Sequence, residues 1–224
     1  MAIAESFGAV KPARHIFFDN SNIFCGAQIT AEKIEPDALW CAVRLYYPHL
    51  FSVIEGRETV GIRVFVGSVA TGHNDVWQAV RDLGYETAVL VRAETSDGRL
   101  GEQAVDEILH LKIANAILDH PAPQTLVIAS GDGRLSSYGT SFPGQAERAL
   151  KAGWNVEVWS WSGPLTGGYR RLIAAYPGRV VVRMLDPFYF QTTFIKAGHY
   201  QVNGVSIQVA GRPAGRLRPT HEAA

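Results

Sequence analysis

Three aspartates from separate parts of the chain, Asp19, Asp106 and Asp132, have the residue type and local setting of a cation site. Asp19 directly follows an apolar run at residues 15–18, and Asp132 comes soon after another at 125–129. Carboxylates that converge on one polar edge repel one another unless a cation lies between them, and oxygen-rich sites of this kind suit Mg²⁺ or Mn²⁺. Such ions hold phosphates and generate a hydroxide nucleophile. The three acids therefore predict metal-assisted chemistry on a phosphate ester.

The elements that would position these acids are short apolar runs separated by helical patterns. Runs that are apolar throughout are typical of strands buried on both faces of a parallel sheet. We expect strands at residues 15–18, 60–66, 87–91, 125–129, 156–159 and 180–184. Helices are expected from Pro36 to Tyr47 and at 75–83, 102–118, 145–152 and 168–175, with a loop or short helix at 20–30. This alternation predicts an α/β fold with a mostly parallel sheet covered on both faces.

Parallel strands bring their carboxyl ends to one edge, which is where open α/β sheets bind ligands. Each acid also has an ordinary structural interpretation. Asp19 can cap a turn or the next helix, and Asp132 can serve as a turn or N-cap residue. Asp106 can be a favourable charge near a helix N-terminus. The order of the three acids on these elements favours a shared site.

The pattern changes after Asp186-Pro187. Short β-type runs follow at 189–195, 200–202 and 205–209, and Asn203-Gly204 between the last two is a strong hairpin signal. We therefore divide the chain into an N-terminal arm (1–13), an α/β domain (14–186), a C-terminal β extension (187–210) and a flexible basic tail (211–224) with Arg212, Arg216 and Arg218.

Composition places the chain among ordinary globular proteins. Apolar residues make up 47% of its 224 residues and the formal net charge is zero, so any nucleic-acid contact must come from a local patch. No signal peptide and no apolar run of membrane-spanning length is present, so we expect a cytoplasmic location and no membrane partner. Cys25 and Cys41 lack metal-ligand spacing and are expected to be reduced core residues.

Four stretches resemble the motifs of the NYN domain, a family in the PIN-like nuclease superfamily. They are Phe17-Phe18-Asp19-Asn20-Ser21-Asn22, Ala104-Val105-Asp106, Val127-Ile128-Ala129-Ser130-Gly131-Asp132-Gly133 and Gly153-Trp154-Asn155-Val156-Glu157-Val158-Trp159. The resemblance covers roughly residues 14–185. It implies a three-layer α/β/α sandwich and metal-dependent cleavage of RNA, most simply single-stranded RNA. It also implies that Asp19, Asp106 and Asp132 hold the metal, and that Asn22 orients the first acid or touches phosphate.

The chain departs from the NYN pattern at two positions. Arg134 stands where the family commonly has a second acid after the one that matches Asp132, and Lys112 stands where it tends to have an acid after the one that matches Asp106. A cation in place of a carboxylate weakens metal affinity. Glu107 is a candidate substitute, although neighbours on a helix point in different directions. Arg134 and Lys112 are instead candidates to hold phosphate directly.

Several other side chains are candidates for contacts with nucleic acid. Ser130 and Thr71 can contact phosphate or cap a turn, and Trp159 and Trp161 can stack on bases or belong to the core. Arg170-Arg171 can contact a phosphate or be simply solvated. Three functions remain open: a metal-dependent ribonuclease, a non-catalytic module that binds RNA or protein, and a phosphatase for a small substrate. The C-terminal extension can pack on the sheet or form a homodimer contact.

Overall fold

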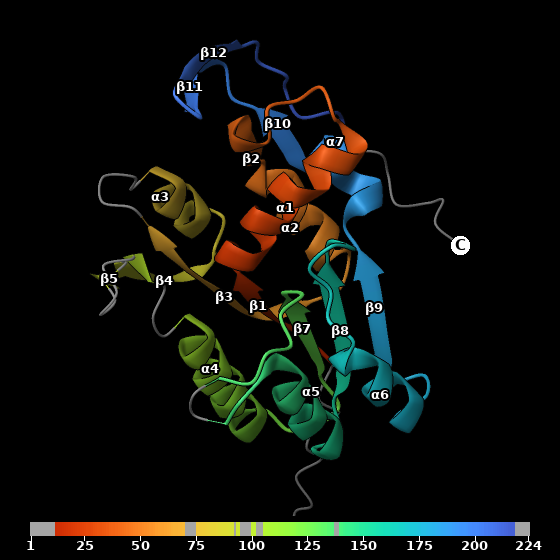
Figure 1. Cartoon of the computed structure of the whole chain (residues 1–224). Coiled ribbons are helices and arrows are strands. Elements are labelled where there is room, and N and C mark those ends of the chain that lie inside the picture. Colours follow the sequence, from red (N-terminus) through yellow and green to blue (C-terminus); the bar gives the residue numbers. More distant parts are fainter. Residues whose placement is uncertain are drawn as a thin grey trace, which may run out of the picture.

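The centre of the molecule is a six-stranded parallel sheet in the order β4-β3-β1-β7-β8-β9. Figure 1 shows this computed structural model of the chain. The structure describes residues 12–69, 75–91, 93–94, 100–101, 105–136 and 139–217. The strands are β1 (Arg14–Asp19), β3 (Val60–Val69), β4 (Glu86–Val91), β7 (Thr125–Ala129), β8 (Asn155–Ser160) and β9 (Val180–Met184). All six predicted strands are present, and the predicted parallel arrangement is confirmed.

Helices cover both faces of the sheet, as the alternating pattern predicts (Figure 1). One face carries α1 (Asn20–Ile34), α2 (Tyr47–Glu55) and α3 (Asp75–Asp82). The other carries α4 (Val105–Asp119), α5 (Phe142–Lys151) and α6 (Gly168–Ala175). Alternate residues of β1 point to opposite faces, so that Phe18 packs in the first core and Phe17 in the second. The arrangement is compatible with a three-layer α/β/α sandwich.

The first helix is longer and more regular than predicted. Residues 20–34 form a continuous helix, α1, whereas the sequence suggested a loop or short helix at 20–30. Asp19 caps this helix, and the close contact of Gly26 with Trp161 explains why a helix-weakening glycine lies inside it: an added Cβ would overlap the Trp161 ring. The helix is therefore stabilised by packing against a distant part of the chain.

The prediction of a helix from Pro36 to Tyr47 is wrong. That segment contains the 3₁₀ turn η1 (Trp40–Ala42) and the short strand β2 (Val43–Leu45), and the helix α2 begins only at Tyr47, with Pro48 in its first turn. The strand β2 pairs antiparallel with β10 (Thr193–Ile195). Its partner thus comes from the other end of the chain, which local periodicity cannot reveal.

The C-terminal extension is tied to this small sheet. The predicted β-run at 189–195 is instead helix α7 (Tyr189–Thr192), preceded by the 3₁₀ turn η2 (Asp186–Phe188) and followed by β10. The predicted hairpin is confirmed as β11 (Gly198–Val202) and β12 (Val205–Val209), and its turn residue Asn203 adopts a positive φ of 51°. Two further short strands, β5 (Ala93–Glu94) and β6 (Leu100–Gly101), pair with each other.

Residues 211–217, the described part of the expected flexible tail, pack on the domain. The Arg212 guanidinium donates two hydrogen bonds to Glu35 at the end of α1, at 2.8 and 2.9 Å. Backbone bonds join Arg212 to Ile195, and Gly215 N–H to the Phe190 carbonyl. This segment therefore fastens the extension to the C-terminal end of α1.

The two cysteines are free thiols, but the prediction that they belong to the core is wrong. Cys25 is exposed on α1, and Cys41 is half-buried in η1. The apolar neighbours of Cys25 in sequence lie on other faces of the helix, where Ile23 is fully buried. No helix among the described residues is long and apolar enough to cross a membrane.

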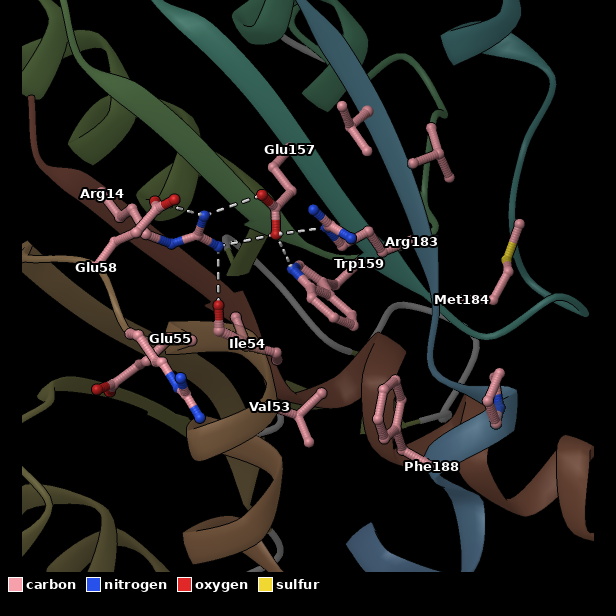
Figure 2. Close-up of a pocket in the computed structure, with 15 residues that line it drawn as sticks. Arg14, Val53, Ile54, Glu55, Glu58, Glu157, Trp159, Arg183, Met184 and Phe188 are labelled. Atoms are coloured by element: carbon pink, nitrogen blue, oxygen red, sulfur yellow. Dashed lines mark hydrogen bonds and ion pairs between the residues drawn. The ribbon is translucent and has the colours of Figure 1, made fainter. Parts of the chain in front are cut away.

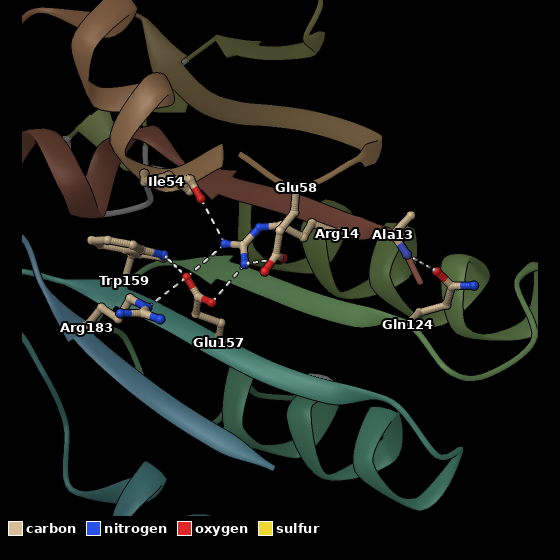
Figure 3. Close-up of polar contacts among 8 residues, drawn as sticks. All are labelled: Ala13, Arg14, Ile54, Glu58, Gln124, Glu157, Trp159 and Arg183. Atoms are coloured by element: carbon tan, nitrogen blue, oxygen red, sulfur yellow. Dashed lines mark hydrogen bonds and ion pairs between the residues drawn. The ribbon is translucent and has the colours of Figure 1, made fainter. Parts of the chain in front are cut away.

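A buried ion pair joins the start of β1 to the middle of β8 on the face that carries α2 (Figure 3). The Arg14 guanidinium donates to both carboxylate oxygens of Glu157, at 2.8 and 2.9 Å, and to the carbonyl of Ile54 at the end of α2. The Trp159 indole donates to the same carboxylate, and the Arg183 guanidinium forms an ion pair with it. The network therefore connects three strands and a helix through one buried charge.

We expect the protein to lose stability as the pH falls below about 6.5, the ordinary pKa of histidine. Burial lowers the pKa of His15, although the hydrogen bond with Gln124 opposes this, and burial also lowers the pKa of His110. The unfolded chain therefore takes up protons before the folded chain does, so acid favours unfolding. Urea unfolding between pH 7.5 and 5.5 measures this, and His15→Phe should flatten the dependence. The exposed His199, changed to Gln, is the control that should leave it unchanged.

Candidate active site at the carboxyl edge of the sheet

Two of the three predicted acids lie where the strand order of the sheet reverses. The chain adds β3 and β4 on one side of β1 and then returns to place β7 on the other side. The strands β1 and β7 are in register, with Phe18 opposite Ala129. Asp19 and the loop that holds Asp132 therefore emerge side by side, at the type of crevice in which open α/β sheets bind ligands.

Asp19 has the capping role that the sequence allowed, and it also accepts a hydrogen bond from the loop after β7. Its carboxylate accepts a hydrogen bond from the backbone N–H of Asn22, at 3.0 Å, and so caps α1. The other oxygen accepts from the Ser130 hydroxyl, at 2.9 Å. The residue is 3% exposed. A buried carboxylate at the N-terminus of a helix is stabilised in its charged form by these donors and by the helix dipole.

Ser130 connects the two acidic segments. Its hydroxyl donates to Asp19 and also accepts from the backbone N–H of Asp132, at 3.2 Å. Asn22 makes a second link, since its side-chain oxygen accepts from the N–H of Gly131, at 2.8 Å. Asn22 was predicted to orient the first acid or contact phosphate, and Ser130 to contact phosphate or cap a turn. In the structure both residues hold the loop after β7 against the start of α1.

The loop after β7 depends on its two glycines. A Cβ at Gly131 would overlap the Ser160 hydroxyl, and one at Gly133 would overlap the Thr166 hydroxyl. The Gly131 carbonyl also accepts a hydrogen bond from the N–H of Thr166. Close packing against the segment after β8 therefore fixes the backbone on either side of Asp132.

Asp132 is buried but carries its own counter-ion. Arg134 donates through Nε and Nη2 to Oδ2, at 2.9 and 2.6 Å, and through its backbone N–H to Oδ1, at 2.8 Å. Burial raises the pKa of the Asp132 carboxyl, but the bonds from Arg134 outweigh this and the pKa is lowered overall. The Asp132 side chain is 8% exposed and that of Arg134 is 85% exposed. The guanidinium therefore covers the carboxylate from the solvent side.

Asp106 joins the group through electrostatics. It lies in the first turn of α4, a helix that packs on β1 and β3. Asp132 raises the pKa of the Arg134 guanidinium most strongly, and the charges of Asp106 and Asp19 raise it further. All three predicted acids thus act on one cation at this edge.

Lys112 is not part of this group. It forms a close ion pair with Glu86, the first residue of β4, which is level with Phe17 in the register of the sheet and two strands away from β1. The partner of Lys112 is therefore a carboxylate on β4 and not one of the three acids.

Two residues near the acids were missed by the sequence analysis. The Tyr169 hydroxyl is buried without a hydrogen-bond partner among the described residues, and burial, together with the charges of Asp132 and Asp19, raises its pKa. His110 lies one helical turn after Asp106, and the Asp132 charge acts on its ring. The spacing of four residues between Asp106 and His110 could have predicted that the two side chains lie on the same face of the helix. No local pattern predicts the position of Tyr169, because only the fold brings α6 to this loop.

Of the other candidates for contact with nucleic acid, the two tryptophans are buried and the two arginines are exposed. Trp161 is fully buried and donates to the Ile23 carbonyl, and Trp159 is 6% exposed, so both belong to the core. Arg170 and Arg171 are exposed on α6. Thr71 lies outside the described residues.

Whether the carboxyl edge can bind a divalent ion depends on which side-chain oxygens lie there. Within the described ranges, no group of three or more His, Cys, Asp or Glu side chains is close enough to hold a metal. Magnesium, however, is usually bound by one or two carboxylates with water and substrate phosphate. Asp19 and Asp132, linked through Ser130, supply carboxylates of this kind. A cation that binds Asp132 must displace Arg134.

Comparisons with known proteins add no family assignment. A search against protein-family models finds no match, and a search of curated proteins finds none either.

Proposed function

We propose that this chain is a metal-dependent ribonuclease of the NYN type, which hydrolyses phosphodiester bonds of single-stranded RNA at the carboxyl edge of its sheet. The observation that carries the proposal is the link from Asp19 through the Ser130 hydroxyl to Asp132, at the point where the strand order reverses. The resemblance of the surrounding motifs to the NYN domain supports the same conclusion.

Each residue of the site has a definite task in this proposal. Asp19 and Asp132 hold Mg²⁺ or Mn²⁺, and Asp106 adds negative charge beside them. Asn22 and Ser130 keep the two acidic segments together. When bound, the ion would supply a hydroxide nucleophile and polarise the phosphate. Arg134, once displaced from Asp132, is long enough and exposed enough to donate to a phosphate oxygen of the RNA.

The direct experiment is incubation of the purified protein with end-labelled single-stranded RNA and Mn²⁺ or Mg²⁺. We expect cleavage that stops on addition of EDTA and resumes with excess metal. Asp132→Asn should lose the activity. Absence of cleavage at every pH tested, with either ion, would remove the ribonuclease proposal. Turnover of p-nitrophenyl phosphate without RNA cleavage would instead indicate a phosphatase.

A second candidate function is RNA binding without catalysis. The observation that favours it is the guanidinium of Arg134, which already neutralises the Asp132 carboxylate. On this proposal, RNA binds through arginines and needs no divalent ion. Tight binding in a filter assay that EDTA leaves unchanged, without cleavage, would decide for this function. We expect the opposite, that chelation weakens binding.

Arg134→Asn should make the ribonuclease easier to activate with metal. The substitution removes the cation that competes for Asp132. We therefore expect the Mn²⁺ concentration at half-maximal cleavage to fall by about tenfold, which is about the free energy of one hydrogen bond to a charged group. Stability should change by less than about 1 kcal/mol, because the side chain is 85% exposed. Cleavage assayed across a Mn²⁺ titration measures this. Weaker RNA binding with no gain in metal response would favour the non-catalytic function.

A further inference from the structure

A cavity lies on the face of the sheet that carries α2, over β8 and β9, and none of the three acids lines it. Its volume is about 470 Å³, within the range of small-molecule sites. Figure 2 shows it bordered by the end of α2, by β8 and β9, and by the turn η2. The lining residues that matter here include Val53, Glu157, Trp159, Arg183 and Phe188.

Much of the wall is apolar. In Figure 2 the side chains of Val53 and Phe188 face the Trp159 ring, and the rings of Trp159 and Phe188 are 6.2 Å apart. Val181 and Met184 line the same space and remain 42% and 37% exposed. A ligand with a flat apolar body would bury this surface and gain the corresponding hydrophobic free energy.

Each carboxylate that lines the cavity already has a cationic partner. Glu157 accepts hydrogen bonds from Arg14 at two oxygens and from the Trp159 indole at 2.5 Å, and it forms an ion pair with Arg183 Nε at 3.2 Å (Figure 3). Glu55 pairs with Arg63, and Glu58 pairs with Arg14. An incoming hydrogen-bond donor or cation would have to displace one of these partners. The cavity therefore does not favour a cationic ligand.

Arg183 provides donors that remain available. Its guanidinium lies 5.7 Å over the Trp159 ring, and its Nε forms an ion pair with Glu157. In the part of the chain that the structure describes, neither of its terminal nitrogens has a hydrogen-bond partner, and its side chain is 53% exposed. Two terminal N–H groups of a fixed guanidinium match the oxygens of a carboxylate or phosphate.

We propose that this cavity binds a small organic anion. The flat apolar body of the ligand lies among Val53, Trp159 and Phe188, and its carboxylate or phosphate pairs with the terminal nitrogens of Arg183. The site is distinct from the proposed RNA site, since none of Asp19, Asp106 and Asp132 lines the cavity.

The test uses 8-anilinonaphthalene-1-sulfonate, a fluorescent aromatic anion, as the probe. We expect saturable binding to the intact chain, with Arg183→Gln weakening the affinity by about tenfold, the effect of losing one charge-assisted hydrogen bond. Arg170→Gln, which changes an exposed arginine on α6, is the matched control and should bind the probe like the wild type. The uncharged N-phenyl-1-naphthylamine should bind more weakly and should not respond to Arg183→Gln.

Val53→Trp fills the cavity from α2 and should abolish binding of the probe. Indole-3-acetate, a carboxylate with a flat body, should displace the probe from the wild type. Equal affinity of wild type and Arg183→Gln for the sulfonate would overturn the proposal, even if Val53→Trp does not fold. RNA cleavage should be the same in wild type and Arg183→Gln, so this result is separate from the fate of the proposed ribonuclease.

Discussion

Asp19→Asn is expected to reduce RNA cleavage by about 1,000-fold. Asparagine keeps one oxygen but loses the charge, and the contribution of a metal ion to a phosphoryl reaction is several kcal/mol, of which each 1.4 kcal/mol is tenfold in rate. Folding should be preserved, because Asn caps helices about as well as Asp, and Asp19 caps α1. Initial rates with labelled RNA at saturating Mn²⁺ measure the effect.

The matched control for the acids is Asp119→Asn. Asp119 is an exposed aspartate at the C-terminal end of α4, the helix whose first turn holds Asp106. It has the same chemistry but lies far along the helix from the site, so its loss should leave cleavage unchanged. Equal rates for Asp19→Asn and Asp119→Asn would show that Asp19 only caps a helix.

The second large effect concerns stability. Arg14→Met should lower the free energy of unfolding by about 3 kcal/mol, the usual result of leaving a buried charge without its partner. The side chains of Arg14 and Glu157 are only 9% and 10% exposed, and the remaining partners of Glu157 are the Trp159 indole and the Arg183 guanidinium. Urea unfolding at pH 7.5 measures the change.

Glu58→Gln is the control for that experiment. Glu58 also pairs with Arg14, but its side chain is 68% exposed, so its removal should change stability by less than about 1 kcal/mol. If Arg14→Met and Glu58→Gln destabilise the protein equally, the buried pair contributes no more than a surface pair, and the network in Figure 3 is not what joins β1 to β8.

The sheet was predictable because its strands have a strong local signal. Residues 125–129 and 180–184 are short runs rich in Val, Ile and Leu, and β7 and β9 have the predicted bounds. The helix α6 likewise has the predicted bounds, 168–175. In these segments, local preference and burial in the fold point to the same structure.

The errors fall where the partner of a segment is distant in sequence. The segment 43–45 has no strong local preference and becomes β2 only because residues 193–195 pair with it. Gly26 weakened the signal of α1, and Trp161 fills the space beside it. Tertiary contacts of this kind override weak propensities and leave little trace in a local pattern.

For the candidate site, the sequence predicted the positions of the acids better than the roles of the cations. Asp19 and Asp132 meet at the carboxyl edge because Asp19 ends β1 and Asp132 follows closely on the neighbouring parallel strand β7. Arg134, predicted to contact the substrate, instead pairs with Asp132 because the loop turns back on itself over two residues. Lys112, in the middle of α4, pairs with Glu86 of β4. A side chain's partner depends on where the loop and helix take it, which residue spacing alone does not determine.

The account depends on acidic side chains at one edge of the sheet sharing a divalent ion, and binding of Mn²⁺ measured by electron paramagnetic resonance tests this most directly. We predict that the wild type takes up Mn²⁺ at a site that disappears in both Asp19→Asn and Asp132→Asn and persists in Asp119→Asn. A wild type that binds no Mn²⁺, or whose Mn²⁺ binding survives both substitutions, would contradict the account.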